Sequence, residues 1–268
     1  MPAPDMGRTQ IAKWDPEFAE RVIGVIGPLL KRWFRAEVRG LQALPPGGVL
    51  VVSNHSGGLY AVDVLVFATD YYDKLGYDRP VYTLANDILF KSRTRDVLVR
   101  AGVIRATRDN AAEALRSGGV VVVFPGGDHD AYRPSWSANK IDFAGRKGYV
   151  STALEAGVPI VPMVSIGAQE NQLYLGRGEW LAKRLGFKRL LGTQSMPITF
   201  GFPFGLNVVL PLNLPLPTKI VTQVLEPIDI ADRFGPNPDV EEVDIHVRSV
   251  MQTALDRLAS ERRFPVLG

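Results

Sequence analysis

Cysteine is absent from the 268-residue sequence. Its absence excludes disulfide bonds, a thiolate nucleophile, cysteine-based zinc sites and iron–sulfur clusters. It is also typical of proteins that work in a reducing compartment. Any catalysis must therefore use histidine, carboxylate, hydroxyl or cationic side chains.

Long apolar runs and a strong charge imbalance are absent as well. No stretch of about 18 uninterrupted apolar residues occurs, which argues against a transmembrane helix. Residues 1–10 have no apolar core, so we expect no secretory signal and a cytoplasmic protein. The net charge of +3 is too small to indicate nucleic-acid binding. The 46% hydrophobic content is typical of a folded globular protein.

Residues 11–37 show the three- and four-residue apolar spacing of an amphipathic helix, and Pro28 should kink it. Two alternatives follow for this helix. It lies in a membrane interface, or it packs on the protein core. Cations and tryptophans that favour the interface are Lys31, Arg32, Arg35, Arg39, Trp14 and Trp33.

Strand-like and helix-like segments alternate through the rest of the chain. This alternation predicts an α/β fold with a mostly parallel sheet flanked by helices. With no repeat and no clear linker, we expect one domain at 37–268 after an N-terminal amphipathic segment at 1–36. Predicted strands are 49–53, 81–85, 102–106, 120–124, 160–165, 198–202 and 219–224. Predicted helices are 63–72, 95–100, 110–117, 147–156 and 240–262.

His55 is the best candidate for catalysis among the three histidines, His55, His129 and His246. It directly follows the predicted buried strand 49–53, and ligands bind at the carboxyl ends of strands in open α/β sheets. A histidine there can act as a general base if a carboxylate fixes its tautomer. Asp63 is the nearest candidate downstream. Gly57 and Gly58 are expected to leave room for a substrate beside the backbone.

Other chemistries have weaker signals. Ser56 lacks the Gly-x-Ser-x-Gly elbow of a nucleophilic serine. His129 lies between Asp128 and Asp130, but three adjacent residues seldom converge on one ion, and no metal-binding helix motif is present. We therefore expect neither a serine nucleophile nor a metal.

Two further segments are suited to anions. A basic cluster lies between residues 91 and 116, and its Arg108 comes just after a predicted strand, where a phosphate of a lipid or of coenzyme A would bind. The turn Phe124, Pro125, Gly126, Gly127 follows the strand 120–124 and should expose backbone amides to an oxyanion or phosphate. The basic cluster comprises Lys91, Arg93, Arg95, Arg100, Arg105, Arg108 and Arg116.

The order of these motifs resembles the glycerolipid acyltransferase superfamily, whose members acylate lysophosphatidate and related lipids from acyl-CoA or acyl carrier protein. The likeness covers roughly residues 35–165. It rests on segments that occur in the family's order: Asn54 and His55 to Asp63; Gly102 to Ile104 with Arg108; Phe124 to Gly127; Phe143 with Arg146 to Gly148; and Val158 to Pro162.

The resemblance implies that an acceptor hydroxyl, deprotonated by His55 with Asp63, attacks an acyl thioester without an acyl-enzyme. No tightly bound cofactor is implied. The donor is acyl-CoA or acyl carrier protein, the acceptor is a lipid, and the protein works peripherally at the inner face of the cell membrane. The alternative is an inactive lipid-binding or lipid-transfer protein on the same fold. Candidate substrate-binding residues are Asn54, Ser56, Gly57, Gly58, Arg108, Phe124, Pro125, Gly126, Gly127, Asp128, His129 and Lys147.

The sequence departs from the family pattern at two points. Seven residues separate His55 from Asp63 where the family has four, so the residues around Gly57 must loop out. Gly126 stands where the family has glutamate, and Asp128 or Asp130 is a candidate replacement for that carboxylate. Both departures resemble the branch related to acylglycerol and phytyl-ester acyltransferases.

Residues 200–217, called the apolar segment below, combine apolar side chains with four prolines and therefore cannot form one long helix. Two alternatives remain. The segment lines an acyl-chain groove or rests on lipid, or it is an ordinary core segment with proline turns.

Overall fold

Short runs of aliphatic residues build a seven-stranded central sheet in the computed structural model, which describes residues 9–91, 94–187, 195–264 and 266–267. Five strands form one mutually parallel block, and β10 runs antiparallel to β6 beside it, so the prediction of a mostly parallel sheet is confirmed. The order across the sheet is β1 (Glu37–Arg39), β10 (Val221–Val224), β6 (Ile160–Ile166), β2 (Val49–Ser53), β5 (Val120–Val123), β3 (Val81–Ala85) and β4 (Val103–Arg105).

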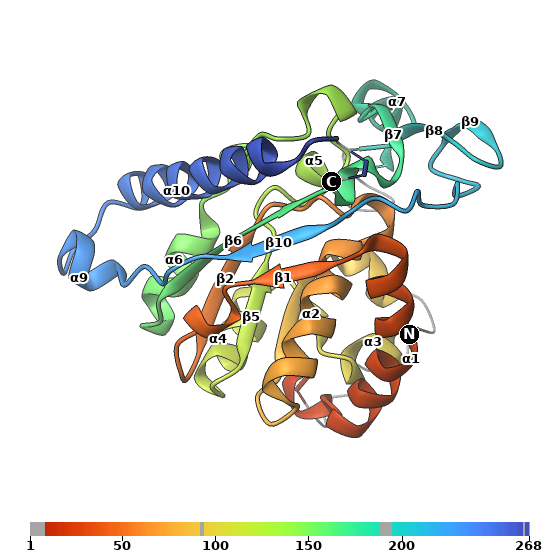
Figure 1. The fold of residues 1–268 in the computed structure, drawn as a ribbon. Helices are drawn as coiled ribbons and strands as arrows, with labels where there is room; N and C mark the ends of the chain where they lie inside the picture. Colours follow the sequence, from red (N-terminus) through yellow and green to blue (C-terminus); the bar gives the residue numbers. More distant parts are fainter. Residues whose placement is uncertain (1–8, 92–93, 188–194, 265, 268) are drawn as a thin grey trace.

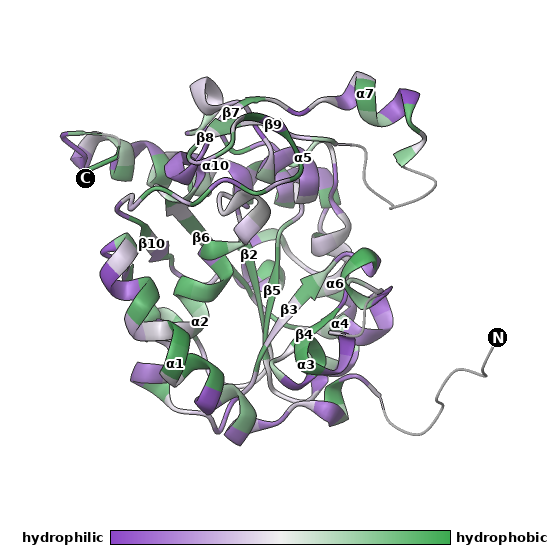
Figure 2. Cartoon of the chain, turned by 90° about the vertical axis from the view of Figure 1, so that its right-hand side faces the viewer, coloured by the Kyte–Doolittle hydropathy of each residue, from purple (hydrophilic) through white to green (hydrophobic). Residues whose placement is uncertain are grey.

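Helices cover both faces of this sheet (Figures 1 and 2). Strand β2 is buried throughout because alternate residues enter different cores. Val49 and Val51 pack with α1 (Pro16–Phe34) and α2 (Val62–Leu75). Leu50 and Val52 pack on the other face with α4 (Arg108–Arg116), α6 (Gly148–Ala156) and α10 (Val240–Glu261). Shorter helices are α3 (Arg95–Arg100), α5 (Gly127–Ala131), α7 (Glu179–Arg184) and α9 (Ile230–Phe234).

Helix α1 covers most of the predicted range 11–37, after a short 3-10 turn at Ile11–Lys13. The side chain of Asp15 caps it by accepting a hydrogen bond from the Phe18 amide. One face, which includes Ile23 and Gly27, is buried and contacts α2. The opposite face exposes Val25, Leu29 and Trp33. Packing on the protein therefore accounts for one face of the helix only.

A second, smaller sheet lies beside the carboxyl ends of β2 and β5 (Figure 1). It is antiparallel and consists of β7 (Leu173–Gly176), β8 (Ile198–Gly201) and β9 (Gly205–Val208). The strand predicted at 198–202 therefore exists as β8 but does not join the central sheet. The two strands β8 and β9 form a tight hairpin with Phe202 and Phe204 at its turn.

The apolar segment is largely exposed rather than buried. Seven of its large apolar side chains keep between 45% and 71% of their surface accessible, so the alternative of an ordinary core segment is wrong. These side chains are Phe200, Phe202, Phe204, Leu206, Leu210, Leu214 and Leu216. None of the helices in the described ranges is both long enough and apolar enough to cross a bilayer.

Candidate active site

Two loops from neighbouring strands meet at the centre of the site. Strands β2 and β5 are parallel, with Val52 opposite Val123, so the residues after them emerge at the same edge of the sheet. As a result the ring of Phe124 lies against the imidazole of His55, with 4.6 Å between the ring centroids. The sheet register thus brings the Asn54-His55 motif and the Phe124–Gly127 motif together.

His55 and Asp63 form a hydrogen-bonded pair, with Nδ1 of His55 2.9 Å from Oδ2 of Asp63. The extra residues between them are taken up by a 3-10 turn at Gly58–Tyr60. Helix α2 then begins at Val62, which places Asp63 in its first turn, where the positive end of the helix dipole favours a carboxylate. The longer spacing is therefore compatible with the pair.

Asp63 is ionised in its buried position. Burial by itself would raise the pKa of Asp63, but the interactions with the His55 ring and the amides of Ser56 and Gly57 outweigh it and hold the pKa below its usual value. The Ser56 amide donates to Oδ2 at 2.8 Å. Because an ionised carboxylate only accepts hydrogen bonds, Nδ1 of His55 carries the proton in this pair.

The two glycines after His55 make room for protein atoms, not for a substrate as we expected. A Cβ on Gly57 would lie 2.3 Å from Oδ1 of Asp63. A Cβ on Gly58 would lie 1.9 Å from the hydroxyl of Tyr174 in β7, and its φ of +58° also favours glycine. The glycines therefore let α2 and the small sheet pack closely around the His55 loop.

The residues on either side of His55 differ in their hydrogen bonding. Asn54 is buried, and both ends of its amide bond the backbone of Ser165 in β6, at 2.8 and 2.9 Å. It therefore fixes the end of β2. The Ser56 hydroxyl is buried and has no hydrogen-bond partner among the described residues.

The Pro125-Gly126-Gly127 turn leads into the short helix α5. Its geometry differs from the expected row of free amides, because the Gly127 amide donates to the Phe124 carbonyl within the turn. The turn's carbonyls are also engaged: Nη1 of Arg146 donates to Pro125 and Gly126, at 3.3 and 2.7 Å. Arg146, one of the residues that carried the family resemblance, thus holds the third motif in place.

Asp128 and His129 point to different partners. Asp128 forms an ion pair with Arg146 at 3.2 Å, whereas Nε2 of His129 lies 3.2 Å from Asp142. Across the residues that the structure describes, no group of three potential metal ligands converges.

Asp130, one of the two candidate replacements for the family glutamate, lies against the backbone of His55. Its Oδ2 accepts a hydrogen bond from the His55 backbone amide at 2.6 Å. The contact joins residues 75 positions apart, so no local pattern indicates it. Tyr60 was also missed: its hydroxyl donates to the Asn213 carbonyl and ties the His55 loop to the apolar segment.

The remaining predicted residues lie farther from His55. Arg108 begins α4 after β4, three strands from β2, which corresponds to about 14 Å at the usual strand spacing. Lys147 contacts Glu241 of α10. Arg93 of the basic cluster lies outside the described residues. Other members of the cluster have acidic neighbours: Arg95 pairs with Asp96, Arg100 with Asp15, Arg105 with Asp87 and Arg108 with Glu155.

The chain is similar to several known proteins. The family model described as Acyltransferase matches residues 35–166. An uncharacterised protein of Mycobacterium tuberculosis is 34% identical over 93% of this chain and 69% of its own length. The mouse "DGAT1/2-independent enzyme synthesizing storage lipids" is 27% identical over 84% of this chain and 61% of its own length.

A solved structure has the same fold. It is the 1-acyl-sn-glycerophosphate acyltransferase PlsC from Thermotoga maritima, with a TM-score of 0.55 and 21% identity over 92% of this chain and 82% of that chain. The family match covers the His55 and Phe124 motifs, and the fold likeness extends over nearly the whole chain. The chain is an acyltransferase and belongs to the glycerolipid acyltransferase superfamily.

Proposed function

We propose that the protein transfers a fatty acyl group from acyl-CoA or acyl carrier protein to a hydroxyl of a glycerolipid or lysophospholipid. The observation that carries this proposal is the pair of His55 and Asp63 at the carboxyl end of β2, with Phe124 packed against the imidazole. The family match supports acyl transfer to lipid in general, and the choice of donor and acceptor belongs to the proposal.

The geometry suits general-base catalysis. With the proton of His55 on Nδ1 and donated to Asp63, the lone pair on Nε2 takes the proton of the acceptor hydroxyl. The oxygen attacks the thioester carbon, an ester bond forms, and the carbon–sulfur bond breaks. Nε2 then returns its proton to the leaving thiolate. Asp63 stabilises the imidazolium that exists between the two proton transfers.

The backbone amides beside His55 do not serve as oxyanion donors in this mechanism. The amide of His55 donates to Asp130, and those of Ser56 and Gly57 donate to Asp63. The charge that develops on the thioester oxygen must therefore be stabilised by other groups.

Replacing His55 with alanine tests the proposal. Loss of a general base is expected to slow acyl transfer about 10²–10⁴-fold. The measurement is thiol release from acyl-CoA and from acyl carrier protein with a panel of glycerolipid, lysophospholipid and simple alcohol acceptors. His246→Ala is the matched control, because His246 lies on α10 and lines a separate cavity.

Two outcomes would contradict this mechanism. One is a folded His55→Ala variant that releases thiol at the wild-type rate. The other is a wild-type protein that binds fatty chains but releases no thiol with any acceptor, which would favour a lipid-binding or lipid-transfer function. The altered His55–Asp63 spacing no longer supports that alternative, since the two side chains are in contact.

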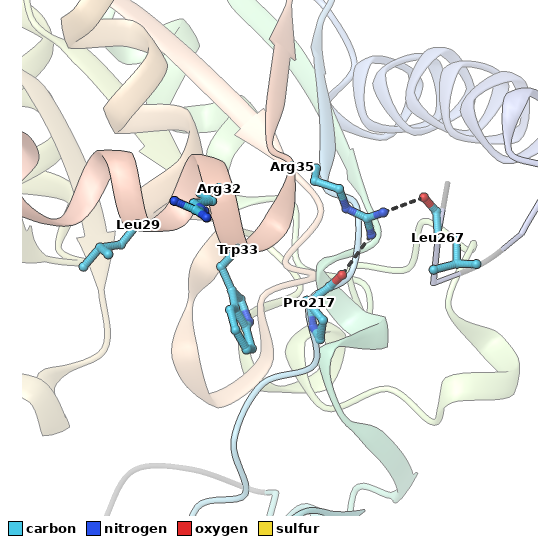
Figure 3. Close-up of a pocket in the computed structure, with 6 residues that line it drawn as sticks. All are labelled: Leu29, Arg32, Trp33, Arg35, Pro217 and Leu267. Carbon is cyan, nitrogen blue, oxygen red and sulfur yellow. Dashed lines mark hydrogen bonds between the residues drawn. The ribbon is translucent and has the colours of Figure 1, made fainter.

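We also propose that the protein attaches peripherally to the inner face of the cell membrane. The outer face of α1 and the apolar segment are joined: the Trp33 indole donates to the Pro215 carbonyl at 3.1 Å. Arg35 donates to the carbonyls of Pro217 and Leu267, beside a cavity of about 590 Å³ (Figure 3). The exposed apolar side chains of both elements therefore form one candidate lipid-binding surface, called the apolar surface below.

Most of the cations that were expected to attract anionic lipid form ion pairs or hydrogen bonds within the protein. Lys31 pairs with Asp70 and Asp73, and Arg39 pairs with acidic neighbours. Arg35 donates to backbone carbonyls. We therefore expect membrane attachment to depend more on apolar contact than on attraction to anionic headgroups, and so to change little with salt concentration. The assignment of Arg108 to a phosphate stays a prediction.

A further inference from the structure

Asp130 is a buried carboxylate that the proposed reaction does not use directly. It is only 1% exposed, and its partner Arg133 is 2% exposed. One oxygen of Asp130 accepts from the His55 amide at 2.6 Å, and the other accepts from the Arg133 guanidinium. A carboxylate in this position links the third sequence motif to the backbone of His55.

Position 126 has no room for a side chain, because Asp130 fills the space beside it. A Cβ on Gly126 would lie 2.4 Å from the Cβ of Asp130 and 3.0–3.1 Å from atoms of its carboxyl group. Helix α5 turns the chain back over Gly126, since the Asp130 amide donates to the Gly126 carbonyl. The glycine at position 126 and the carboxylate at position 130 are therefore two parts of one arrangement.

Arg133 holds Asp130 in a fixed orientation. The guanidinium also donates to the carbonyls of Ala138 and Lys140, and the Arg133 carbonyl accepts from Gln169 at 2.6 Å. Burial lowers the pKa of Arg133 to about 10, which leaves the guanidinium charged at neutral pH. Both oxygens of Asp130 therefore accept hydrogen bonds, one of them from a guanidinium, so the side chain has little freedom to move, and charge-assisted hydrogen bonds are short and strong.

We propose that Asp130 is a positioning residue that fixes the backbone of His55 while Asp63 orients its ring. The inference rests on the proposed acyl transfer by His55. Two separate carboxylates then hold His55: Asp130 bonds its backbone amide, and Asp63 bonds Nδ1 of its ring. Misplacement of a catalytic group by about 1 Å costs about 100-fold in rate, so loss of the amide acceptor should reduce kcat on that scale.

Removing Asp130 alone would leave the Arg133 charge buried without a partner, which destabilises a fold. The test therefore compares two double variants, Asp130→Asn with Arg133→Met and Asp130→Ala with Arg133→Met. Both lack the buried ion pair, but only asparagine keeps an oxygen that can accept from the His55 amide. The wild-type protein is the reference for both, because Arg133→Met alone would leave the Asp130 carboxylate buried without its partner.

We expect the asparagine double variant to keep kcat within a few-fold of the reference. The alanine double variant should lose about 100-fold in kcat, with the KM for acyl-CoA little changed. Its melting temperature should be somewhat lower than that of its asparagine counterpart, because the His55 amide loses its acceptor. Equal kcat values for the two folded double variants would overturn the positioning role and leave Asp130 as a partner of Arg133 only.

A second measurement does not depend on acyl transfer. In the wild-type protein, the short bond to a carboxylate should move the His55 amide proton downfield in the NMR spectrum and slow its exchange with solvent. The alanine double variant should lose both signatures. An ordinary shift and fast exchange in the wild type would refute the proposal. If the signatures are present but no acceptor supports turnover, the proposed function fails and the structural assignment of Asp130 stands.

Discussion

At the scale of the residue, His55 is held at two points, because Asp63 bonds its ring and Asp130 accepts from its backbone amide. The contact between His55 and Asp63 was predictable, because chemistry and chain position coincide there. His55 follows a buried strand and is a rare residue in this chain, and Asp63 is the nearest carboxylate suited to orient it. The contact between Asp130 and the His55 amide was not predictable, because it depends on how α5 turns over Gly126. Free space beside glycines was also misjudged, since sequence does not show which neighbour fills it.

Asp63 contributes to the stability of the fold at neutral pH, and this contribution should be lost in acid. Its pKa is lowered in the folded protein, so its contribution is present above the pKa of the unfolded chain, about 3.9, and is lost as pH falls through the folded value. Urea unfolding of the wild type and of Asp63→Asn should therefore show a stability difference that shrinks as pH falls below about 4.

The comparison isolates Asp63 from other acidic groups with lowered pKa, such as Asp70 and Asp142, because both proteins contain them. A difference that stays constant between pH 6 and pH 3 would show that the carboxylate charge of Asp63 does not contribute to folding. Activity at neutral pH should fall in the same variant, since asparagine stabilises the imidazolium poorly.

Among secondary-structure elements, the buried parallel strands and the longer helices were predicted well. Strands β2 and β3 and helix α3 begin and end at the predicted residues. The missed elements have weak local signals. Strand β1 has only three residues and pairs with β10 from the far end of the chain, and α5 lies directly behind a Pro-Gly-Gly turn. Their formation depends on tertiary contacts that a short window of sequence does not contain.

Two glycines of α1 provide a matched test of its packing. Gly27 faces α2, and a Cβ there would lie 2.8 Å from Cγ2 of Thr69. Gly24 is exposed, and a Cβ there would meet no atom within 4 Å. Gly24→Ala should therefore stabilise the protein by up to about 1 kcal/mol, because alanine favours the helix interior. Gly27→Ala should destabilise it through overpacking, by about 1–3 kcal/mol.

Thermal unfolding of both variants measures this difference. Equal stabilisation by the two alanines would mean that α1 is not packed on α2 in solution, and the helix would then belong to the membrane interface alone.

At the scale of the whole molecule, the apolar surface and the candidate active site are adjacent. Tyr60 follows His55 closely and bonds the Asn213 carbonyl, and Gln172 donates to the same carbonyl at 2.7 Å. A lipid bound at the apolar surface would therefore lie near the carboxyl end of β2. This proximity supports the proposal that the exposed side chains of the apolar surface contact lipid.

Replacing Phe202 and Phe204 together with serine should reduce sedimentation with phospholipid vesicles several-fold. Both side chains are more than half exposed at the turn of the β8–β9 hairpin, so their loss should affect vesicle binding and leave the fold unchanged. Turnover of a short-chain, water-soluble acceptor should be unaffected.

Ile245→Ser is the matched control, because Ile245 is 52% exposed on α10, away from the hairpin (Figure 1). If the double serine variant binds vesicles as well as the wild type, the hairpin does not contact lipid, and α1 becomes the next element to test. A large effect of 0.5 M salt on wild-type binding would contradict the expectation that apolar contact dominates.

The side chain of Asn54 has a consequence for motion in the molecule. By bonding both the amide and the carbonyl of Ser165, it continues the β2–β6 hydrogen-bond ladder one step beyond the end of the strand. The residue before His55 is thus fixed to the central sheet. We therefore expect a substrate that enters the site to displace other groups and to leave the backbone at the end of β2 in place.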